Sequence, residues 1–147
     1  MQKNQAAEPA QHEPAKSLAD WRVSAIMSRP AVAVRRDDTM ADALRAFALS
    51  GLHHLVVVDG GGRCVGILGD RAVAAAWAYD SMTFSTLRLG TVMDVNQPML
   101  AADAKVSDAA RRMRRCGADA VAVVDADGSP VGVLTAGDLI ALLAKPN

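Results

Sequence analysis

The sequence predicts an α+β fold in which two β-α-β-β-α repeats pack on each other about a pseudo-twofold axis. The first observation is an internal repeat with a constant offset of 66 positions, which places Ile26 and Met27 on Val92 and Met93 without gaps. The second is that each copy combines one helical apolar pattern with short β-branched runs. The third is physical. One unit alone would leave a sheet face uncovered, so the copies should cover each other.

The register of the repeat is kept through residues of several structural types. It matches acidic and basic helix positions, turn glycines and strand residues alike, namely Asp37 with Asp103, Asp42 with Asp108, Arg45 with Arg111, Gly51 with Gly117, Asp59 with Asp125, Gly66 with Gly132 and Leu68 with Leu134. Two unrelated apolar segments would not keep one register through all of these positions. We therefore interpret the chain as a tandem duplication, with any ligand site between the copies.

The chain divides into four expected parts. Residues 1–17 are polar, contain Pro9 and Pro14 and show no periodicity, which predicts a disordered tail. Residues 18–80 form the first repeat, residues 81–88 a connector and residues 89–144 the second repeat. The mixed apolar pattern from residue 18 to residue 26 indicates a short helix or turn before the first strand.

In the first repeat, a short strand at residues 31–34 follows Pro30, and Asp37, Asp38 and Thr39 offer N-cap chemistry for the helix after it. Apolar residues spaced as on one helix face start at Met40, and Gly51 ends that helix. The continuous apolar run that follows is typical of a strand buried on both faces. The remaining predicted elements are a strand at 55–58, a glycine-rich turn at 59–62, a strand at 64–68 and a helix from 70 to about 79.

The second repeat predicts the same elements in the same order. They are a strand near 99–100, a helix at about 106–116 that ends before Gly117, a strand at 121–124, a turn at 125–128, a strand at 131–134 and a helix at 137–143.

Composition narrows the classes of function. The 147 residues suit about one compact domain, and 16 basic residues balance 16 acidic ones. This neutrality argues against nucleic acid as the main partner, because phosphate binding normally requires a basic excess. No apolar run reaches the roughly 20 residues of a membrane span. We expect a cytoplasmic protein whose two cysteines, Cys64 and Cys116, are free.

Taken together, three markers resemble one known family. Each repeat opens with a hydrophobic residue and Met, and each has a strand that ends in Asp, at Asp59 and Asp125. The second repeat also contains Gly-hydrophobic-hydrophobic-Thr-x-x-Asp at residues 132–138. In this order, at this spacing and in duplicate, they resemble the cystathionine-β-synthase (CBS) domain pair over residues 23–143.

The resemblance implies a regulatory module that binds an adenosine nucleotide in a cleft between the repeats. In such sites the Thr hydroxyl, here Thr135, contacts phosphate, and the carboxylate, here Asp138, accepts both ribose hydroxyls. A strand end that leads into a helix start presents free N–H groups to an anion. The same spacing is also that of a capping box, in which Thr135 and Asp138 only stabilise the helix start. The two roles can coexist.

The first repeat departs from the family pattern at the positions that matter. Gly69 stands at the position of Thr135 and Ala72 at that of Asp138, so both the hydroxyl and the ribose acceptor are missing. The neighbouring Asp70 and Arg71 occupy the two spacer positions, so they are poor substitutes. We expect at most one competent adenosine site, built around the second repeat, while the other cleft is empty or takes a different ligand.

The resemblance also assigns the rest of the cleft wall. Residues before the central strands would line it, Val133 would press on the base, and Val23 would cover the adenine edge from the partner repeat. His53 and His54 could donate to phosphates, whereas the carboxylate of Asp119 would repel them unless it points away. The predicted wall residues are Asp119, Ala120, Val121, Val133, His53, His54 and Val23.

The sequence therefore predicts a ligand-sensing module and not an enzyme, because no catalytic constellation stands out. It requires no cofactor, and its candidate ligands are AMP, ADP, ATP and S-adenosylmethionine. The family implies a homodimer, with output through self-association or an unidentified partner protein. One alternative is a ligand-free interaction module. A less favoured one is a nucleic-acid-linked regulator that uses the arginines at 111–115.

Overall fold

The computed structural model describes residues 17–94 and 96–145. The tail predicted at residues 1–17 lies outside them, apart from Ser17. The first repeat contains β1 (Ala33–Arg35), α1 (Met40–Ser50), β2 (His54–Val58), β3 (Cys64–Gly69) and α2 (Asp70–Tyr79). The second contains β4 (Met99–Ala101), α4 (Val106–Cys116), β5 (Ala120–Val124), β6 (Pro130–Thr135) and α5 (Ala136–Leu143). The predicted β-α-β-β-α order is confirmed in both repeats.

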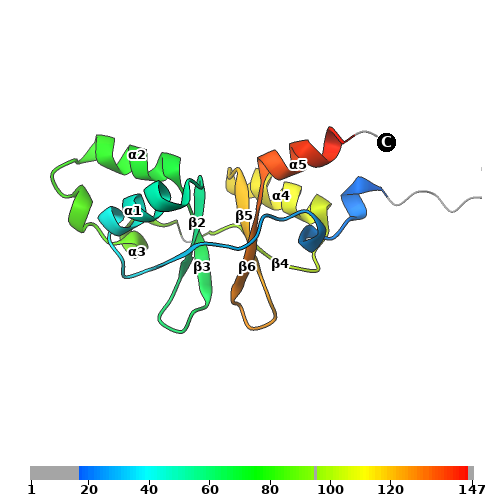
Figure 1. Cartoon of the computed structure of the whole chain (residues 1–147), viewed down its shortest axis with the longest axis horizontal. Coiled ribbons are helices and arrows are strands. Elements are labelled where there is room, and N and C mark those ends of the chain that lie inside the picture. The colour runs from blue at the N-terminus through cyan, green and yellow to red at the C-terminus, as the bar shows by residue number, and fades with distance from the viewer. Residues whose placement is uncertain (1–16, 95, 146–147) are drawn as a thin grey trace, which may run out of the picture.

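Each repeat forms a mixed three-stranded sheet. The order is β1-β2-β3 in one sheet and β4-β5-β6 in the other, with the first pair parallel and the second antiparallel. The two hairpins face each other at the centre of the molecule, and the helices lie on the outer sides (Figure 1). None of the helices in the described ranges is long and apolar enough to cross a bilayer.

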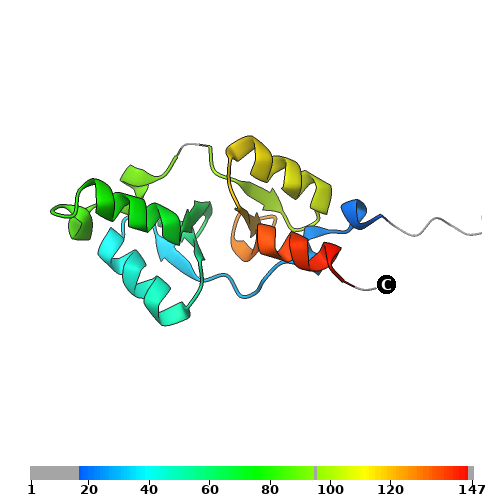
Figure 2. The same cartoon turned by 90° about the horizontal axis from the view of Figure 1, so that it is seen from above.

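The segment before each repeat packs on the other repeat. The short 3-10 helices Leu18–Asp20 and Val23–Ala25 lie against the second repeat before the chain crosses to β1 (Figure 2). The connector behaves in the same way. It forms the 3-10 helix Phe84–Thr86 and α3 (Leu89–Val92) on the first repeat, then crosses to β4. Sequence repeats and packed units therefore do not coincide.

The two exchanges are equivalent contact by contact. The N–H of Val23 donates to the carbonyl of Ala104 at 2.8 Å, and 66 positions later Leu89 donates to Asp38 at 2.9 Å. In the same way, Val106 donates to Trp21 and Met40 donates to Leu87, both at 2.8 Å. These paired hydrogen bonds show that the two repeats are related by a pseudo-twofold axis.

The two cores follow the same rule. Seven buried positions of one core recur in the other at the offset of 66, namely Leu89 and Val23, Val34 and Leu100, Ala43 and Ala109, Phe47 and Met113, Leu55 and Val121, Val57 and Val123, and Leu68 and Leu134. Val23 and Leu89 are fully buried. Val23 completes the core of the second repeat, and Leu89 completes the core of the first. Neither core is complete without a segment from outside its own repeat.

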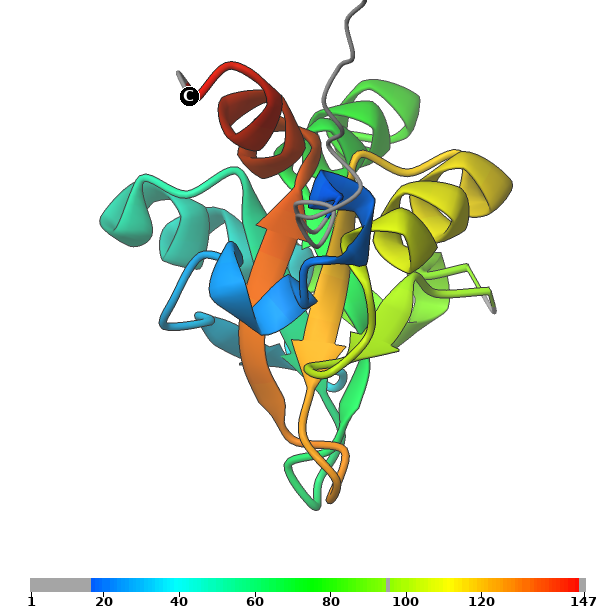
Figure 3. The same cartoon turned by 90° about the vertical axis from the view of Figure 1, so that its right-hand side faces the viewer.

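A third cluster joins the two sheets. Its buried members are Val56, Ala120, Ala122 and Val133, with partly buried Ala31, Cys64, Ile67 and Met99 around them. The strands of the two hairpins lie against each other along this cluster, with helices on the far sides (Figure 3). At about 25 cal/mol per Å² of apolar surface, its burial holds the repeats together.

Gly132 allows the crossing segment to pass close to β6. A Cβ at this position would lie 2.6 Å from the Sδ of Met27 and 2.9 Å from the carbonyl oxygen of Ser28. Ser28 cannot easily move, because its backbone exchanges two hydrogen bonds with Val133, at 2.8 and 3.1 Å. In the first repeat the equivalent Gly66 lies beneath the side chain of Gln97 and not beneath backbone.

We therefore predict that Gly132→Ala destabilises the fold by about 1–3 kcal/mol, the usual cost of overpacking. Chemical denaturation followed by circular dichroism measures this change. Gly60→Ala is the control, because a Cβ there meets no atom within 4 Å, and it should change stability by less than about 1 kcal/mol. Equal free energies of unfolding for the two variants would contradict the close approach.

Candidate functional site

A cavity of about 650 Å³ lies where the starts of α2 and α5 approach each other across the pseudo-twofold axis. Both repeats contribute to its walls, through the residues before β2 and β5 and the first residues of the two helices. The lining residues are His53, His54, Asp70, Arg71, Ala74, Asp119, Thr135, Ala136 and Gly137. Four predicted site residues, His53, His54, Asp119 and Thr135, are thus brought together.

Thr135 and Asp138 form a capping box at the start of α5. The hydroxyl oxygen of Thr135 accepts the N–H of Asp138 at 3.1 Å, and the Asp138 carboxylate accepts the N–H of Thr135 at 2.9 Å. The chain also forms a capping box at Thr39 and Asp42, where α1 begins. The structural interpretation of the Thr-x-x-Asp spacing is therefore correct, and any binding role must be compatible with it.

Asp138 differs from Asp42 in having a partner from the crossing segment. The hydroxyl of Ser28 donates to the Asp138 carboxylate, with oxygen–oxygen distances of 3.2 and 3.3 Å. An ionised carboxylate has about four acceptor positions, and the capping bond and Ser28 use only part of them. A hydroxyl from the solvent side can therefore also reach this carboxylate, as a vicinal diol would.

Two histidines are tied to carboxylates at the cavity wall. His53 Nδ1 lies 2.8 Å from an oxygen of Asp70, and His54 Nε2 lies 2.9 Å from an oxygen of Asp119. The second contact joins the two repeats. The hydrogen bonds from the imidazoles are the main reason that the pKa values of Asp70 and Asp119 are lowered. One oxygen of the Asp119 carboxylate is engaged by His54, so only part of this carboxylate is available to the cavity.

The charges around the cavity are mixed. The positive ends of the α2 and α5 dipoles point towards it, but the N–H groups of Asp70 and Ala136 already donate to the carbonyls of His53 and Asp119, at 3.0 and 2.8 Å. Arg71 lines the same cavity and lies close enough to Asp119 to help lower its pKa. Arg71 and the two helix starts favour an anion, whereas the carboxylates of Asp70 and Asp119, each hydrogen-bonded to a histidine, add negative charge.

Three predicted wall residues do not reach the cleft. Val23 and Val121 are fully buried in the core of the second repeat, and Ala120 is 1% exposed in the cluster between the sheets. Their side chains do not line the cavity described above, and their roles at the cleft wall stay predictions. Val133 is also buried in the cluster between the sheets, at 7% exposure.

Sequence reasoning missed Ser28, which the structure places at the site. Ser28 directly follows the hydrophobic-Met opening of the first repeat, and only its repeat partner, Asp94, marks the position in the sequence. Asp70 and Arg71 belong to the first repeat, and the sequence offered them only as poor substitutes for the missing Thr and Asp. Both line the cavity that contains Thr135. In residues 17–94 and 96–145, no trio of His, Cys, Asp or Glu side chains is placed to hold a metal ion.

Comparison with known proteins identifies relatives of this chain. A CBS domain-containing protein of Dictyostelium discoideum is 29% identical over 132 residues, which cover 84% of this chain and 91% of that protein. The L-aspartate semialdehyde sulfurtransferase of Methanosarcina acetivorans is also 29% identical, over 126 residues, but only 24% of its length is matched.

Two solved structures with bound ligands share the fold. The CBS domain pair of protein MJ0100, in complex with 5′-methylthioadenosine and S-adenosyl-L-methionine, has a TM-score of 0.73 at 25% identity. That match covers 84% of this chain and 95% of the other. The cytosolic domain of the Mg²⁺ channel MgtE, in complex with ATP, has a TM-score of 0.68 at 25% identity, covering 82% and 48% of the two chains.

The family model for the CBS domain matches the chain twice, at residues 23–79 and at residues 89–145. These two matches together span more than half of the sequence and coincide with the repeats found at the offset of 66. The chain therefore belongs to the CBS domain family, as a pair of CBS domains in tandem.

Proposed function

We propose that this chain is a regulatory module that binds one adenosine-type ligand in the cleft at Thr135 and Asp138. The observation that carries the proposal is the carboxylate of Asp138, held at a helix start beside a cavity that both repeats line and that Arg71 borders. The structures of MJ0100 with S-adenosyl-L-methionine and MgtE with ATP support it, because both share this fold.

The proposed ligand lies with its ribose on Asp138 and its 5′ substituent in the cavity. The carboxylate accepts the two ribose hydroxyls, and hydrogen bonds of this charged kind contribute about 1.5–3 kcal/mol each. A phosphate would then meet Arg71, His53 and the N–H groups at the start of α5. The second cleft lacks this chemistry, since Gly69 and Ala72 replace the hydroxyl and the carboxylate.

Regulation follows from the position of the cavity between the repeats. A ligand that contacts both repeats favours the packing in which its contacts are made, and this differential affinity is the only way that it can shift the equilibrium. A partner protein that prefers the same packing is then coupled to the ligand by an equal free energy. The output goes through such a partner or through self-association.

Asp138→Ala should abolish stabilisation by the adenosine ligand. In the wild type, a ligand at 100 times its dissociation constant adds about 2.7 kcal/mol, which corresponds to a rise in Tm of several degrees. The measurement is a thermal-shift series with AMP, ADP, ATP and S-adenosylmethionine, each compared with the same variant without ligand.

Asp42→Ala is the matched control for this experiment, because it removes the equivalent capping carboxylate from α1, away from the cavity. It should lower the Tm and keep the full ligand-induced shift. If no ligand shifts the wild type, the chain is instead an interaction module with empty clefts. An equal loss of shift in both variants would contradict the role of Asp138 in binding.

Arg71→Gln should separate phosphate-bearing ligands from neutral ones. Its guanidinium lies at the wall where a 5′-phosphate would sit, so we expect affinity for AMP to fall by about tenfold. Affinity for 5′-methylthioadenosine, which has no phosphate, should stay within about twofold. Isothermal titration calorimetry measures both, and a parallel loss for the two ligands would show that Arg71 acts through the fold.

A second element of the proposal is self-association through the helices of the first repeat. Leu44 on α1 and Trp77 on α2 are 51% and 57% exposed, and they line an apolar groove of about 420 Å³ between the two helices. Exposed apolar surface of this kind marks an interaction site. A symmetric dimer buries the same surface on both copies.

Leu44→Glu should convert the dimer into a monomer, because it places two carboxylates opposite each other across a symmetric contact. Light scattering coupled to size-exclusion chromatography measures the mass. Met82→Glu is the control, since Met82 is 89% exposed beyond the end of α2 and should leave the dimer intact. A wild-type monomer at high micromolar concentration would remove this part of the proposal.

A further inference from the structure

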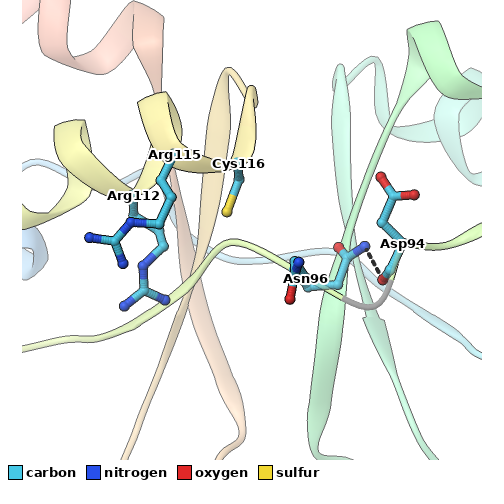
Figure 4. A pocket seen from close by; sticks show the side chains of 6 residues that line it. Asp94, Asn96, Arg112, Arg115 and Cys116 are labelled. Carbon is cyan, nitrogen blue, oxygen red and sulfur yellow. Dashed lines mark hydrogen bonds between the residues drawn. The ribbon is translucent and has the colours of Figure 1, made fainter.

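The second cleft has an opening of its own that does not resemble the first. A cavity of about 670 Å³ lies between α4 and the stretch that leads from α3 to β4 (Figure 4). Its lining residues are Asp94, Asn96, Gln97, Arg112, Arg115 and Cys116. Two of the six are arginines from successive turns of one helix, so the character of this cavity is cationic.

The internal repeat shows that this charge is specific to the second repeat. At the positions of Arg112 and Arg115, the first repeat has Ala46 and Leu49. The same cleft has lost the ribose acceptor, because Ala72 stands at the position of Asp138. One cleft therefore keeps the carboxylate and has apolar residues on α1, whereas the other lacks the carboxylate and has two guanidinium groups on α4.

The guanidinium of Arg112 is fixed and available. Its Nη1 donates to the carbonyl of Met99 at 2.9 Å, which orients the group while leaving its other N–H donors. Among the described residues, the ion pair on this helix joins Arg111 to Asp108 at 3.2 Å, and no carboxylate pairs with Arg112 or Arg115.

The other polar groups of the cavity do not neutralise these charges. The carboxylate of Asp94 points away from the arginines, and Asn96 lies between Asp94 and the two arginines (Figure 4). Gln97 is already engaged, because its amide accepts the N–H of Ile67 at 3.0 Å and donates to the carbonyl of Asp94 at 2.9 Å. The donors left for a ligand are the two guanidinium groups and the amide of Asn96.

We propose that this cavity binds a small phosphate-bearing ligand that does not depend on a ribose. Guanidinium groups present paired N–H donors that match the oxygens of a phosphate, and a charge-assisted pair of this kind is stronger than a neutral hydrogen bond. This site lies beyond the proposed adenosine site, so the protein would sense two chemically different ligands in its two clefts.

The test is calorimetric titration of the full chain with inorganic pyrophosphate at low ionic strength. We expect Arg112→Gln/Arg115→Gln to weaken binding by at least about tenfold. Arg111→Gln/Arg114→Gln is the matched control, because it removes the same charge from the same helix outside the cavity, and it should change affinity by less than about twofold. Arg115→Gln alone, at an exposed position, replaces the double variant if that variant unfolds.

The outcomes separate this site from the adenosine site. Asp138→Ala should leave pyrophosphate binding unchanged, and Arg112→Gln/Arg115→Gln should leave the adenosine-induced thermal shift unchanged. Equal weakening by the two double variants would show only non-specific attraction to the helix and would overturn the proposal. Wild-type protein that does not bind pyrophosphate would overturn it as well, whatever happens with adenosine ligands.

Discussion

The reciprocal exchange of Val23 and Leu89 is the contact on which the rest of the structure depends. Each is fully buried in a core whose strands and helices come from the other side of the molecule. Because burial of an aliphatic side chain of this size contributes about 1.5–3 kcal/mol, neither repeat is expected to be stable without the other's leading segment. The exchange also forces the chain to cross twice between the sheets. Those two crossings pass over Gly132 and Gly66 and place Ser28 and Gln97 against the opposite repeat.

On this symmetric frame, very few residues make the two clefts different. The backbone contacts, the core positions and the helix starts recur at the offset of 66, whereas the polar residues facing the clefts do not. At the positions of Thr135 and Asp138 the first repeat has Gly69 and Ala72, and at the position of Arg115 it has Leu49. Core packing tolerates little change in volume, so it keeps the two copies alike. Exposed cleft positions carry no such constraint, and for that reason the chemistry of the clefts could diverge.

The same distinction explains which features of the structure could be predicted from the sequence. The local patterns predicted the β-α-β-β-α elements of both repeats, together with the helix ends at Gly51 and Gly117, but not α3 at Leu89–Val92. They could not show that the segment containing Val23 packs on the second repeat, since periodicity identifies a buried face but not the face that covers it. Only the family resemblance placed Val23 against the partner repeat. Ser28 was missed for the same reason, because its contact with Asp138 spans 110 positions.

The double role of Asp138 links ligand binding to this exchange. As a capping residue, its carboxylate is already oriented by the N–H of Thr135, so a ligand does not have to order it. As an acceptor, it is also engaged by the hydroxyl of Ser28, on the segment whose other end is anchored in the second core by Val23. Two ribose hydroxyls that arrive at this carboxylate compete with Ser28 or share the oxygens with it. Either way, the free energy of binding depends on where the crossing segment lies. In the proposed function, a site built in this manner would report its occupancy through the segment that holds the two repeats together.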